Sequence, residues 1–428
     1  MVIVFALLAL AVLVTANWYL WRRLFRDTTG RPGRVRRAGA VLIGGGWVLA
    51  IAALVAERTG APFWLQRVLA WPGFLWLALS IYLLLAVVAG EVVRPLLRRL
   101  LERRDRRGEP AVAAVPRPER VPAGAPGEKP QEPGEGGPAS EEPREPGGAT
   151  QATAPSRRLI VSRVVAGAAA AAAVGTVGQG TYGVLRGPRV KRVTVPLAKL
   201  PRAAHGYRIA VVSDIHLSPV LGRGFAQKVV DTINSTRPDL IAVVGDLVDG
   251  SVKDLGPAAA PLAQLEARHG SFFVTGNHEY FSGAEQWVEE VRRLGLRPLE
   301  NDRTELAWFD LAGVNDIAGE SEGQGPDFAK ALGDRDTARA CVLLAHQPVQ
   351  IHDAVDHGVD LQLSGHTHGG QLWPGNLVAE LANPTVAGLE RYGDTQLYVS
   401  RGAGAWGPPT RVGAPSDITV IELASKQA

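Results

Sequence analysis

Two histidines stand two residues apart in the glycine-flanked stretch GHTHGGQ at 365–371. The preceding stretch VDLQLS at 359–364 alternates apolar and polar residues, which is typical of a β-strand. Because side chains at positions i and i+2 of an extended chain point the same way, His366 and His368 can aim at one metal ion or at two neighbouring ions. The surrounding glycines permit tight turns and leave the imidazoles open to a substrate.

Polar side chains that can bind metals close four other predicted strands as well. These endings are SDIH at 213–216, GDLVD at 245–249, GNH at 276–278 and AH at 345–346. Asp214 and His216 repeat the i, i+2 spacing, and Asp246 follows a glycine where a carboxylate could bridge two ions. A single loop histidine is more often only hydrogen-bonded. Five strand ends of this composition together favour a metal centre over that reading.

The residue types also restrict the kind of metal. Imidazole and carboxylate ligands together suit borderline divalent ions such as Zn, Mn or Fe. The single cysteine, Cys341, excludes both a thiolate metal site and an intrachain disulfide. Cys341 lies in the apolar run ACVLLAH at 340–346, so we expect it to be a buried packing residue.

The elements that would carry these residues alternate between strands and helices. The strand-like runs at 207–217 and 238–250 flank the amphipathic stretch 224–238, and the strand-like run at 270–280 precedes the helical stretch 283–296. Such alternation predicts a layered α/β domain over residues 190–428. Ligand sites in such domains gather at the carboxyl ends of the strands.

The ordered set D-x-H, GD-x-x-D, GNH-E, H and GH-x-H resembles the motifs of the calcineurin-like metallophosphoesterases. The stretches SGHTHGGQLWPG at 364–375 and SRGAGAWGPPTRVGAPSDITVIEL at 400–423 resemble the membrane-anchored bacterial subgroup of that family. The resemblance covers residues 190–428. It implies a four-layer αββα sandwich with two divalent metal ions at the ends of the sheets.

The resemblance also implies a role for each residue of the motifs. One ion would be held by Asp214, His216 and His368, the other by Asn277, His346 and His366, with Asp246 bridging the two. His278 would be the general acid, and Asp249 would orient it. A turn-capping carboxylate is the alternative for Asp249, and Glu279 is given no chemistry.

The reaction that follows from this resemblance is hydrolysis of a phosphate mono- or diester by a metal-activated hydroxide. Gly250 stands where many phosphoprotein phosphatases have a phosphate-binding arginine, which argues against a phosphoprotein substrate. An envelope or lipid-linked phosphoester is the expected substrate. The alternative is a non-catalytic, metal-stabilised binding or sensor module for phosphorylated envelope components. His278 favours the enzyme, because a binding module has no need of a general acid.

The overall composition, 46% hydrophobic and 21% charged, hides regions of very different character. Residues 1–93 contain apolar stretches at 2–21, 38–56 and 71–93, each near the ~20 residues that cross a bilayer, which predicts a three-span transmembrane region. Residues 158–184 predict a weaker fourth span, because it is rich in Ala and Gly and contains Arg163. Between these regions, residues 94–157 are first basic and then rich in Pro, Glu and Gly. This composition predicts a disordered cytoplasmic linker.

Arginines beside the predicted spans indicate their orientation. They crowd the segments 22–37 and 94–107, and such clusters stay on the cytoplasmic side of a membrane. The N-terminus and residues 190–428 are therefore predicted to be extracytoplasmic. The pair Arg157–Arg158 is either a twin-arginine-like export signal or a cytoplasmic flank of the fourth span. Since topology explains the arginines, the net charge of +4 is not taken to indicate nucleic-acid binding, and no protein partner is evident.

Overall fold

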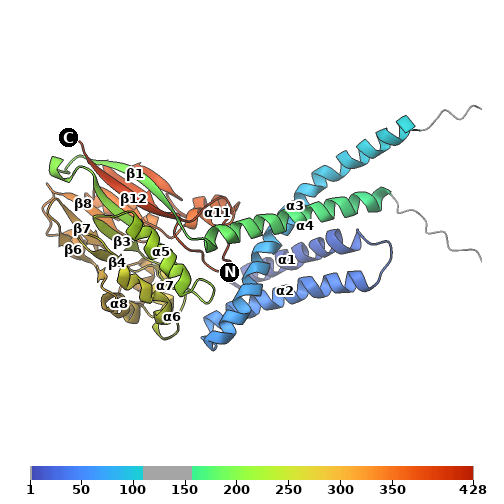
Figure 1. Ribbon diagram of the computed structural model, residues 1–428, viewed down its shortest axis with the longest axis horizontal. Helices are drawn as coiled ribbons and strands as arrows, with labels where there is room; N and C mark the ends of the chain where they lie inside the picture. Colours follow the sequence, from blue (N-terminus) through green and yellow to red (C-terminus); the bar gives the residue numbers. More distant parts are fainter. Residues whose placement is uncertain (1, 109–156, 428) are drawn as a thin grey trace, which may run out of the picture.

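The computed structural model of the chain describes residues 2–108 and 157–427. Long helices gather on one side of the molecule and a layered α/β domain on the other (Figure 1). The long helices are α1 (Val2–Trp21), α2 (Arg34–Arg58), α3 (Phe63–Gly108) and α4 (Arg157–Leu185), with a short π-helical segment at Arg22–Arg26.

Three of these helices are long and apolar enough to cross a membrane. The qualifying segments are Arg34–Arg58, Phe63–Leu100 and Arg157–Leu185. They contain the predicted spans at 38–56, 71–93 and 158–184, which are therefore confirmed as candidate membrane helices. The stretch 2–21 forms helix α1, and that it spans the membrane stays a prediction.

Small residues let these helices approach one another closely. A Cβ atom on Gly73 of α3 would come within 2.7 Å of the backbone oxygen of Leu49 in α2. A Cβ atom on Gly90 of α3 would come within 2.6 Å of the Val165 side chain in α4. Close backbone approach at small residues is the usual way in which helices associate inside a bilayer.

Helix α3 is longer than the sequence analysis predicted. Residues 94–108, assigned above to the linker, continue the helix to Gly108. This stretch is rich in Leu and Arg, which are strong helix formers. The remainder of the predicted linker, 109–156, lies outside the described residues.

The α/β domain contains two six-stranded sheets. The first has the order β1 (Arg189–Leu197), β12 (Asp417–Ser425), β2 (Tyr207–Val212), β3 (Leu240–Val244), β4 (Ser271–Val274), β5 (Arg297–Pro298). The second has the order β10 (Gly388–Tyr392), β11 (Thr395–Val399), β9 (Leu361–Ser364), β8 (Ala340–Leu344), β7 (Phe309–Gly313), β6 (Asp302–Glu305). Strands β2 to β5 are mutually parallel, and so are β7, β8, β9 and β11. The carboxyl ends of the central strands therefore meet along one edge of each sheet.

Helices cover the outer faces of both sheets. The first sheet is covered by α5 (Arg223–Ser235), α6 (Val252–Ala259) and α8 (Ala284–Arg293), and the second by α9 (Phe328–Leu332) and α10 (Ile351–Asp356). Between the sheets, Phe272 of the first and Leu311 of the second belong to one buried apolar cluster. These layers confirm the predicted αββα sandwich.

The remaining short elements lie mostly in the loops at the strand ends. They are α7 (Asn277–Ser282), α11 (Gly375–Ala382) and 3-10 turns at Arg202–Ala204, Ala260–Gln264, Ile317–Glu322, Pro348–Gln350 and His368–Gly370. Two of them, α7 and the turn at His368–Gly370, carry residues of the predicted site.

Candidate metal centre

The structure brings all nine predicted site residues to the carboxyl ends of the parallel strands. Asp214 and His216 follow β2, Asp246 and Asp249 follow β3, Asn277 and His278 follow β4, His346 follows β8, and His366 and His368 follow β9. Strands from both sheets thus contribute to one site. The order of the strands along the chain is the order of the sequence motifs.

Left-handed backbone directs several of these side chains. Among the described residues, eight non-glycine residues have positive φ, and five of them are predicted ligands: Asp214, His216, Asp246, His366 and His368. Such a conformation costs about 1–3 kcal/mol per residue, and it persists where the surrounding structure imposes it. The two D-x-H and H-x-H pairs therefore lie in turns beyond the strands. The turns, and not the alternation of an extended strand, aim these side chains.

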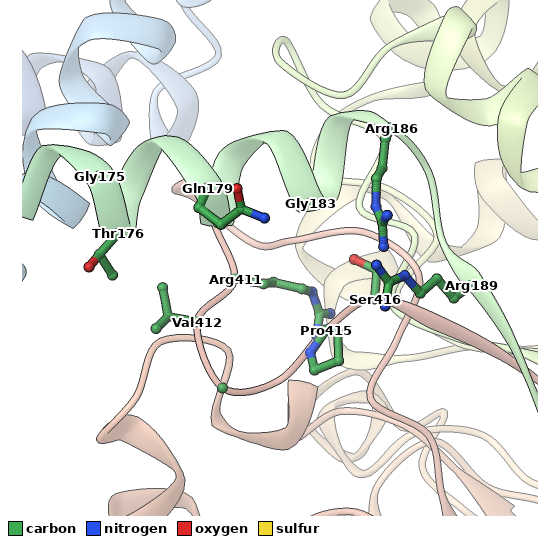
Figure 2. Close-up of a pocket in the computed structure, with 12 residues that line it drawn as sticks. Gly175, Thr176, Gln179, Gly183, Arg186, Arg189, Arg411, Val412, Pro415 and Ser416 are labelled. Carbon is green, nitrogen blue, oxygen red and sulfur yellow. The ribbon is translucent and has the colours of Figure 1, made fainter.

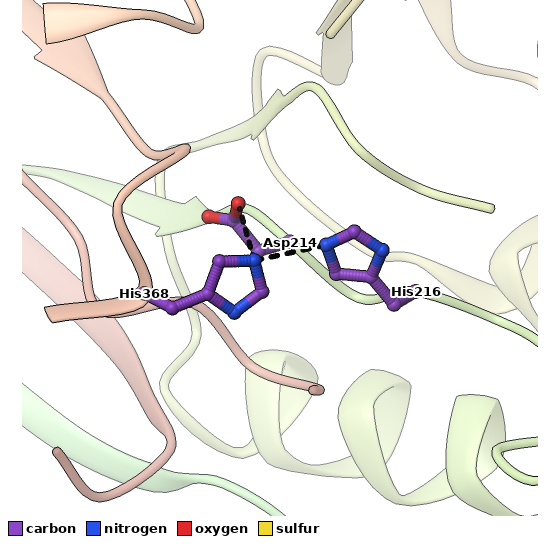
Figure 3. Close-up of side chains that lie close together, drawn as sticks. All are labelled: Asp214, His216 and His368. Atoms are coloured by element: carbon purple, nitrogen blue, oxygen red, sulfur yellow. Dashed lines mark hydrogen bonds and ion pairs between the residues drawn. The ribbon is translucent and has the colours of Figure 1, made fainter. Parts of the chain in front are cut away.

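Asp214, His216 and His368 form the first cluster (Figure 3). The Nε2 atoms of His216 and His368 lie 3.0 Å apart, and Nε2 of His368 lies 3.4 Å from Oδ1 of Asp214. The Nδ1 atom of His216 is engaged by a carboxylate oxygen of Asp249 at 2.7 Å, so its Nε2 carries the lone pair. That nitrogen and the ligand atoms of Asp214 and His368 all lie within 4.8 Å of one another.

Asp246, His346 and His366 form the second cluster. The Nδ1–H group of His346 donates to the Val244 carbonyl at 2.9 Å, which leaves the lone pair of Nε2 facing Oδ2 of Asp246 at 3.1 Å. Within the described part of the chain, this buried Nε2 has no hydrogen-bond partner. Asn277 joins the cluster through its Oδ1 atom, 3.0 Å from Nδ1 of His366.

The donor set of both clusters fits divalent cations. Imidazole nitrogens and carboxylate oxygens crowd together in a buried space, which is unfavourable unless a cation or protons lie between them. Oδ2 of Asp246 lies 3.1 Å from Nε2 of His346 and 3.7 Å from Nε2 of His216, so this carboxylate stands between the clusters. The residues therefore suit one ion in each cluster with Asp246 shared.

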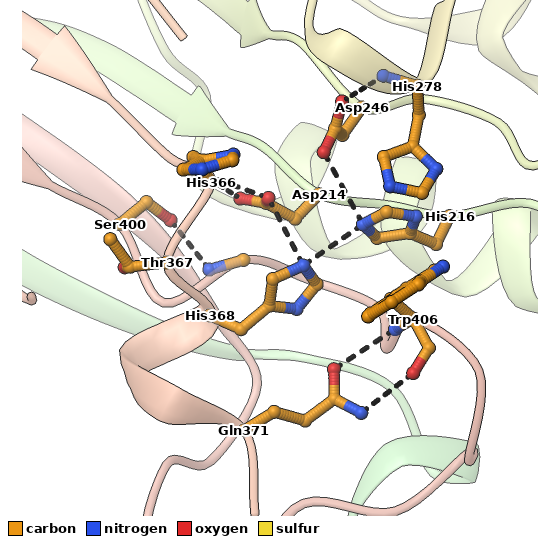
Figure 4. A network of polar contacts seen from close by, with 12 residues as sticks. Asp214, His216, Asp246, His278, His366, Thr367, His368, Gln371, Ser400 and Trp406 are labelled. Carbon is orange, nitrogen blue, oxygen red and sulfur yellow. Dashed lines mark hydrogen bonds and ion pairs between the residues drawn. The ribbon is translucent and has the colours of Figure 1, made fainter. Parts of the chain in front are cut away.

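Hydrogen bonds hold the two clusters together across the sheets. The backbone N–H of His366, after β9, donates to the Asp214 carboxylate, after β2, at 3.0 Å (Figure 4). The backbone N–H of His278 donates to Oδ1 of Asp246 at 2.9 Å. Each carboxylate thus fixes the loop of another motif as well as its own.

Asp249 contacts two imidazoles through one oxygen. Its Oδ1 atom lies 2.7 Å from Nδ1 of His216 and 2.8 Å from Nδ1 of His278. Burial by itself would lower the pKa of His278, but the hydrogen bond and negative charge of Asp249 outweigh burial and raise that pKa to about 9. The Asp249 side chain therefore acts on His216 and His278, and in the described residues it caps no turn.

Glu279 has a positioning role that the sequence analysis did not assign. Its two buried carboxylate oxygens accept the backbone N–H groups of Asp246, Leu247 and Gly276, at 2.9, 2.8 and 2.6 Å. These bonds join the loop after β3 to the loop after β4. The position of Glu279 directly after GNH was the available signal.

Arg411 and Gln371 also hold the site from outside the predicted set. The buried guanidinium of Arg411 lies 3.1 Å from Nδ1 of His368 and donates to the His368 carbonyl at 3.1 Å. The Gln371 side chain donates to the Trp406 carbonyl at 2.9 Å and accepts from its N–H at 3.0 Å (Figure 4). Gln371 belongs to the GHTHGGQ stretch, whereas nothing in the local sequence marks Arg411 as a neighbour of His368.

Helix α4 packs against the loop that carries Arg411. A Cβ atom on Gly180 would lie 2.7 Å from the Arg411 carbonyl oxygen. Beside this contact is a cavity of about 520 Å³, lined by α4 and the loop at 411–416 (Figure 2). Its lining includes the arginines Arg186, Arg189 and Arg411 but none of the predicted ligands.

A second cavity, of about 450 Å³, opens onto the metal centre. Its lining includes Asp246, Asn277, His278, His366 and His368. The remaining wall comes partly from α2 and α3. The site is therefore accessible, and the long helices border it.

Known proteins are similar in sequence to this chain. Residues 207–370 match the sequence model of the calcineurin-like phosphoesterase family. A Danio rerio protein named "transmembrane protein with metallophosphoesterase domain" is 41% identical over 256 residues, which cover 56% of this chain and 58% of that protein. This chain thus spans little more than half of that relative.

The similarity to two bacterial relatives extends over a larger share of their length. An "uncharacterized metallophosphoesterase" of Helicobacter pylori (strain J99) is 38% identical over 251 residues, 58% of this chain and 67% of that protein. A protein of the same name from Aquifex aeolicus is 35% identical over 243 residues, 56% of this chain and 92% of that protein. The chain therefore belongs to the calcineurin-like metallophosphoesterase family.

Proposed function

We propose that the chain is a membrane-tethered phosphoesterase that uses two divalent metal ions to hydrolyse phosphate mono- or diesters outside the cytoplasm. The observation that carries this proposal is the pair of Asp/His clusters around Asp246, with His278 beside them in an open cavity. A metal-stabilised binding module would need the clusters but not a histidine of raised pKa held at the cavity wall.

The two ions, Mn, Zn or Fe, would be held by the seven side chains named above. Asp214, His216 and His368 suit one ion, Asn277, His346 and His366 suit the other, and Asp246 suits both. When bound, such ions polarise phosphoryl oxygens and lower the pKa of water.

His278 would serve as the general acid. Asp249 holds its Nδ1 atom, so the proton on Nε2 of the imidazolium is the one available to a leaving oxygen in the cavity. Although burial lowers the pKa of His278, the contact with Asp249 raises it, which favours the protonated form of this imidazole. Proton donation of this kind is typically worth ~10²–10⁴-fold in rate.

The proposed orientation is supported by the arrangement of the helices. The Arg-rich connection between α1 and α2 and the carboxyl end of α3 lie at the end of the bundle away from the α/β domain (Figure 1). If those arginines are cytoplasmic, the domain and its metal centre face the opposite side of the membrane.

The proposed activity can be tested on the full chain in detergent. The protein would be stripped with a chelator, reloaded separately with Mn, Zn or Fe, and supplied with p-nitrophenyl phosphate or bis(p-nitrophenyl) phosphate. We expect turnover that disappears on stripping and returns with metal, and the preferred ester would separate phosphatase from phosphodiesterase. Two bound metals without turnover of any phosphoester would instead support the binding module.

A further inference from the structure

The cavity over the metal centre is shared between the α/β domain and the membrane helices. On one side it is lined by ligands and by His278, and on the other by Leu54, Glu57 and Arg58 of α2 and by Phe74 and Leu77 of α3. The same space of about 450 Å³ therefore touches both the catalytic groups and the helices that are candidates to cross the bilayer.

The cavity residues that come from α2 and α3 include both apolar and charged side chains. Leu54 lies inside the predicted span 38–56, and Phe74 and Leu77 lie inside the predicted span 71–93. Glu57 and Arg58 follow the first of these spans directly, where α2 ends. The helix side of the cavity thus combines two charged residues at the end of α2 with apolar residues of the predicted spans.

Apolar side chains that border the cavity are partly uncovered. Phe281 is 73% exposed and Trp406 is 50% exposed, and both line the cavity beside His278. Leu54 is 40% exposed on α2. A tryptophan such as Trp406 is favourable at the boundary between water and lipid, because its ring is apolar and its N–H group is polar.

Arg58 supplies a guanidinium group, which the part of the cavity lining that comes from the domain lacks. It lines the cavity together with Gly250, the position where a phosphate-binding arginine was expected in other phosphatases. The Arg58 side chain is exposed, and it makes no hydrogen bond or ion pair with any other residue in the described ranges. A guanidinium with free donors is suited to a phosphate oxygen.

From this arrangement we propose that the substrate is a membrane lipid whose headgroup contains the phosphoester. Its phosphate lies between the metal centre and Arg58, and its hydrocarbon chain lies along Leu54, Phe74 and Leu77. The lipid enters sideways from the bilayer. This inference rests on the proposed hydrolase and specifies its substrate class.

The reaction on such a lipid balances without a further reagent. The oxygen of water forms a bond to phosphorus while the bond from phosphorus to the leaving oxygen breaks. His278 gives its Nε2 proton to the leaving oxygen, and the proton lost by water passes to solvent. The products are an alcohol and a phosphate carrying one ester bond fewer.

The test compares lipid and water-soluble esters on the metal-loaded full chain. Phosphatidic acid, a monoester, and phosphatidylglycerol, a diester, are presented in detergent mixed micelles, and the two p-nitrophenyl esters are the soluble substrates. Leu54→Trp fills the apolar part of the cavity. We expect it to lower the ratio of lipid to soluble turnover by about tenfold.

The matched control is Val48→Trp on the same helix, because Val48 is 66% exposed and is not among the residues that line the cavity. This variant should keep the ratio of the unmodified chain. A second variant, Arg58→Gln, should raise KM for the lipid by about tenfold, since it removes a charged hydrogen-bond donor, and Arg58→Lys should restore part of the loss.

The outcomes separate the two proposals. Metal-dependent turnover of the soluble esters with equal ratios in Leu54→Trp, Val48→Trp and the unmodified chain would overturn the lipid inference and leave the hydrolase standing. Unchanged lipid kinetics in Arg58→Gln would likewise overturn the assigned role of Arg58. Absence of turnover on every ester by a metal-loaded chain would overturn the hydrolase itself.

Discussion

Nδ1 of His278 lies 2.8 Å from Oδ1 of Asp249, and His278 is the one histidine of the cavity lining that is not a predicted ligand. The same oxygen reaches His216, a predicted metal ligand, at 2.7 Å. His278, the proposed proton donor, and His216 of the first cluster are thus linked through a single carboxylate. Variants of His278 and of Asp249 should therefore differ in their effect on metal binding.

His278→Ala removes the proposed proton donor and no predicted ligand. We expect turnover to fall by ~10²–10⁴-fold with the metal content unchanged. Rates on esters of decreasing leaving-group pKa, together with elemental analysis of the protein, measure both quantities. A variant with a near-normal rate on the poorest leaving group would remove His278 from the mechanism.

Asp249→Asn keeps the shape of the side chain but removes its charge. Because the carboxylate supports His216 as well as His278, both metal affinity and turnover should fall, each by about 10–100-fold. Titration of the stripped protein with metal, followed by activity at saturating metal, separates the two effects. Unaltered metal affinity would show that His216 does not need the Asp249 carboxylate in order to bind metal.

Gly180→Ala tests the contact between α4 and the loop that carries Arg411. The added methyl group would lie 2.7 Å from the Arg411 carbonyl oxygen, so the loop must move, and with it the guanidinium that contacts His368. We expect metal affinity to fall by about tenfold, as for other residues that orient a ligand.

The control for that variant is Gly178→Ala in the same helix, where a Cβ atom would meet nothing within 4 Å. It should leave metal affinity unchanged, since Ala is favourable in a helix. Equal metal affinities in the two alanine variants would show that α4 does not position the site.

Cys341 makes the proposed orientation measurable. The thiol is fully buried, and burial raises its pKa to about 12, so the native chain should resist thiol reagents until it is unfolded. Against this background, Ser235→Cys in the domain should react with a membrane-impermeant maleimide on intact cells. Arg31→Cys, in the connection between α1 and α2, should react only after the membrane is opened. The reverse pattern would place the domain in the cytoplasm.

The motif residues could be predicted because each belongs to a short local pattern at a strand end. The turns at Asp214 and His366 bring those patterns together, although their backbone is left-handed and not extended as the spacing argument assumed. The layered α/β domain followed from the strand–helix alternation, whereas the four-layer αββα sandwich was implied by the family resemblance. The structure confirms both.

Contacts between distant segments could not be predicted from the sequence. Arg411 reaches His368 across 43 positions, and Arg58 reaches the cavity from a helix that was interpreted only as an anchor. The end of α3 was misplaced for a different reason. The basic composition of residues 94–108 was interpreted as part of a linker. The Leu and Arg residues of this stretch favour a helix, and they continue the apolar helix that precedes them.

The most direct test of the central claim is the metal content of the full chain, measured by elemental analysis beside phosphoester turnover, for the unmodified protein and for Asp246→Asn. Asp246 stands between the clusters, 3.1 Å from Nε2 of His346 and 3.7 Å from Nε2 of His216. We predict two ions per unmodified chain, and weaker metal loading with abolished turnover in the variant. An unmodified chain that hydrolyses phosphoesters without bound metal, or a variant with full metal and full turnover, would contradict a dinuclear centre bridged by Asp246.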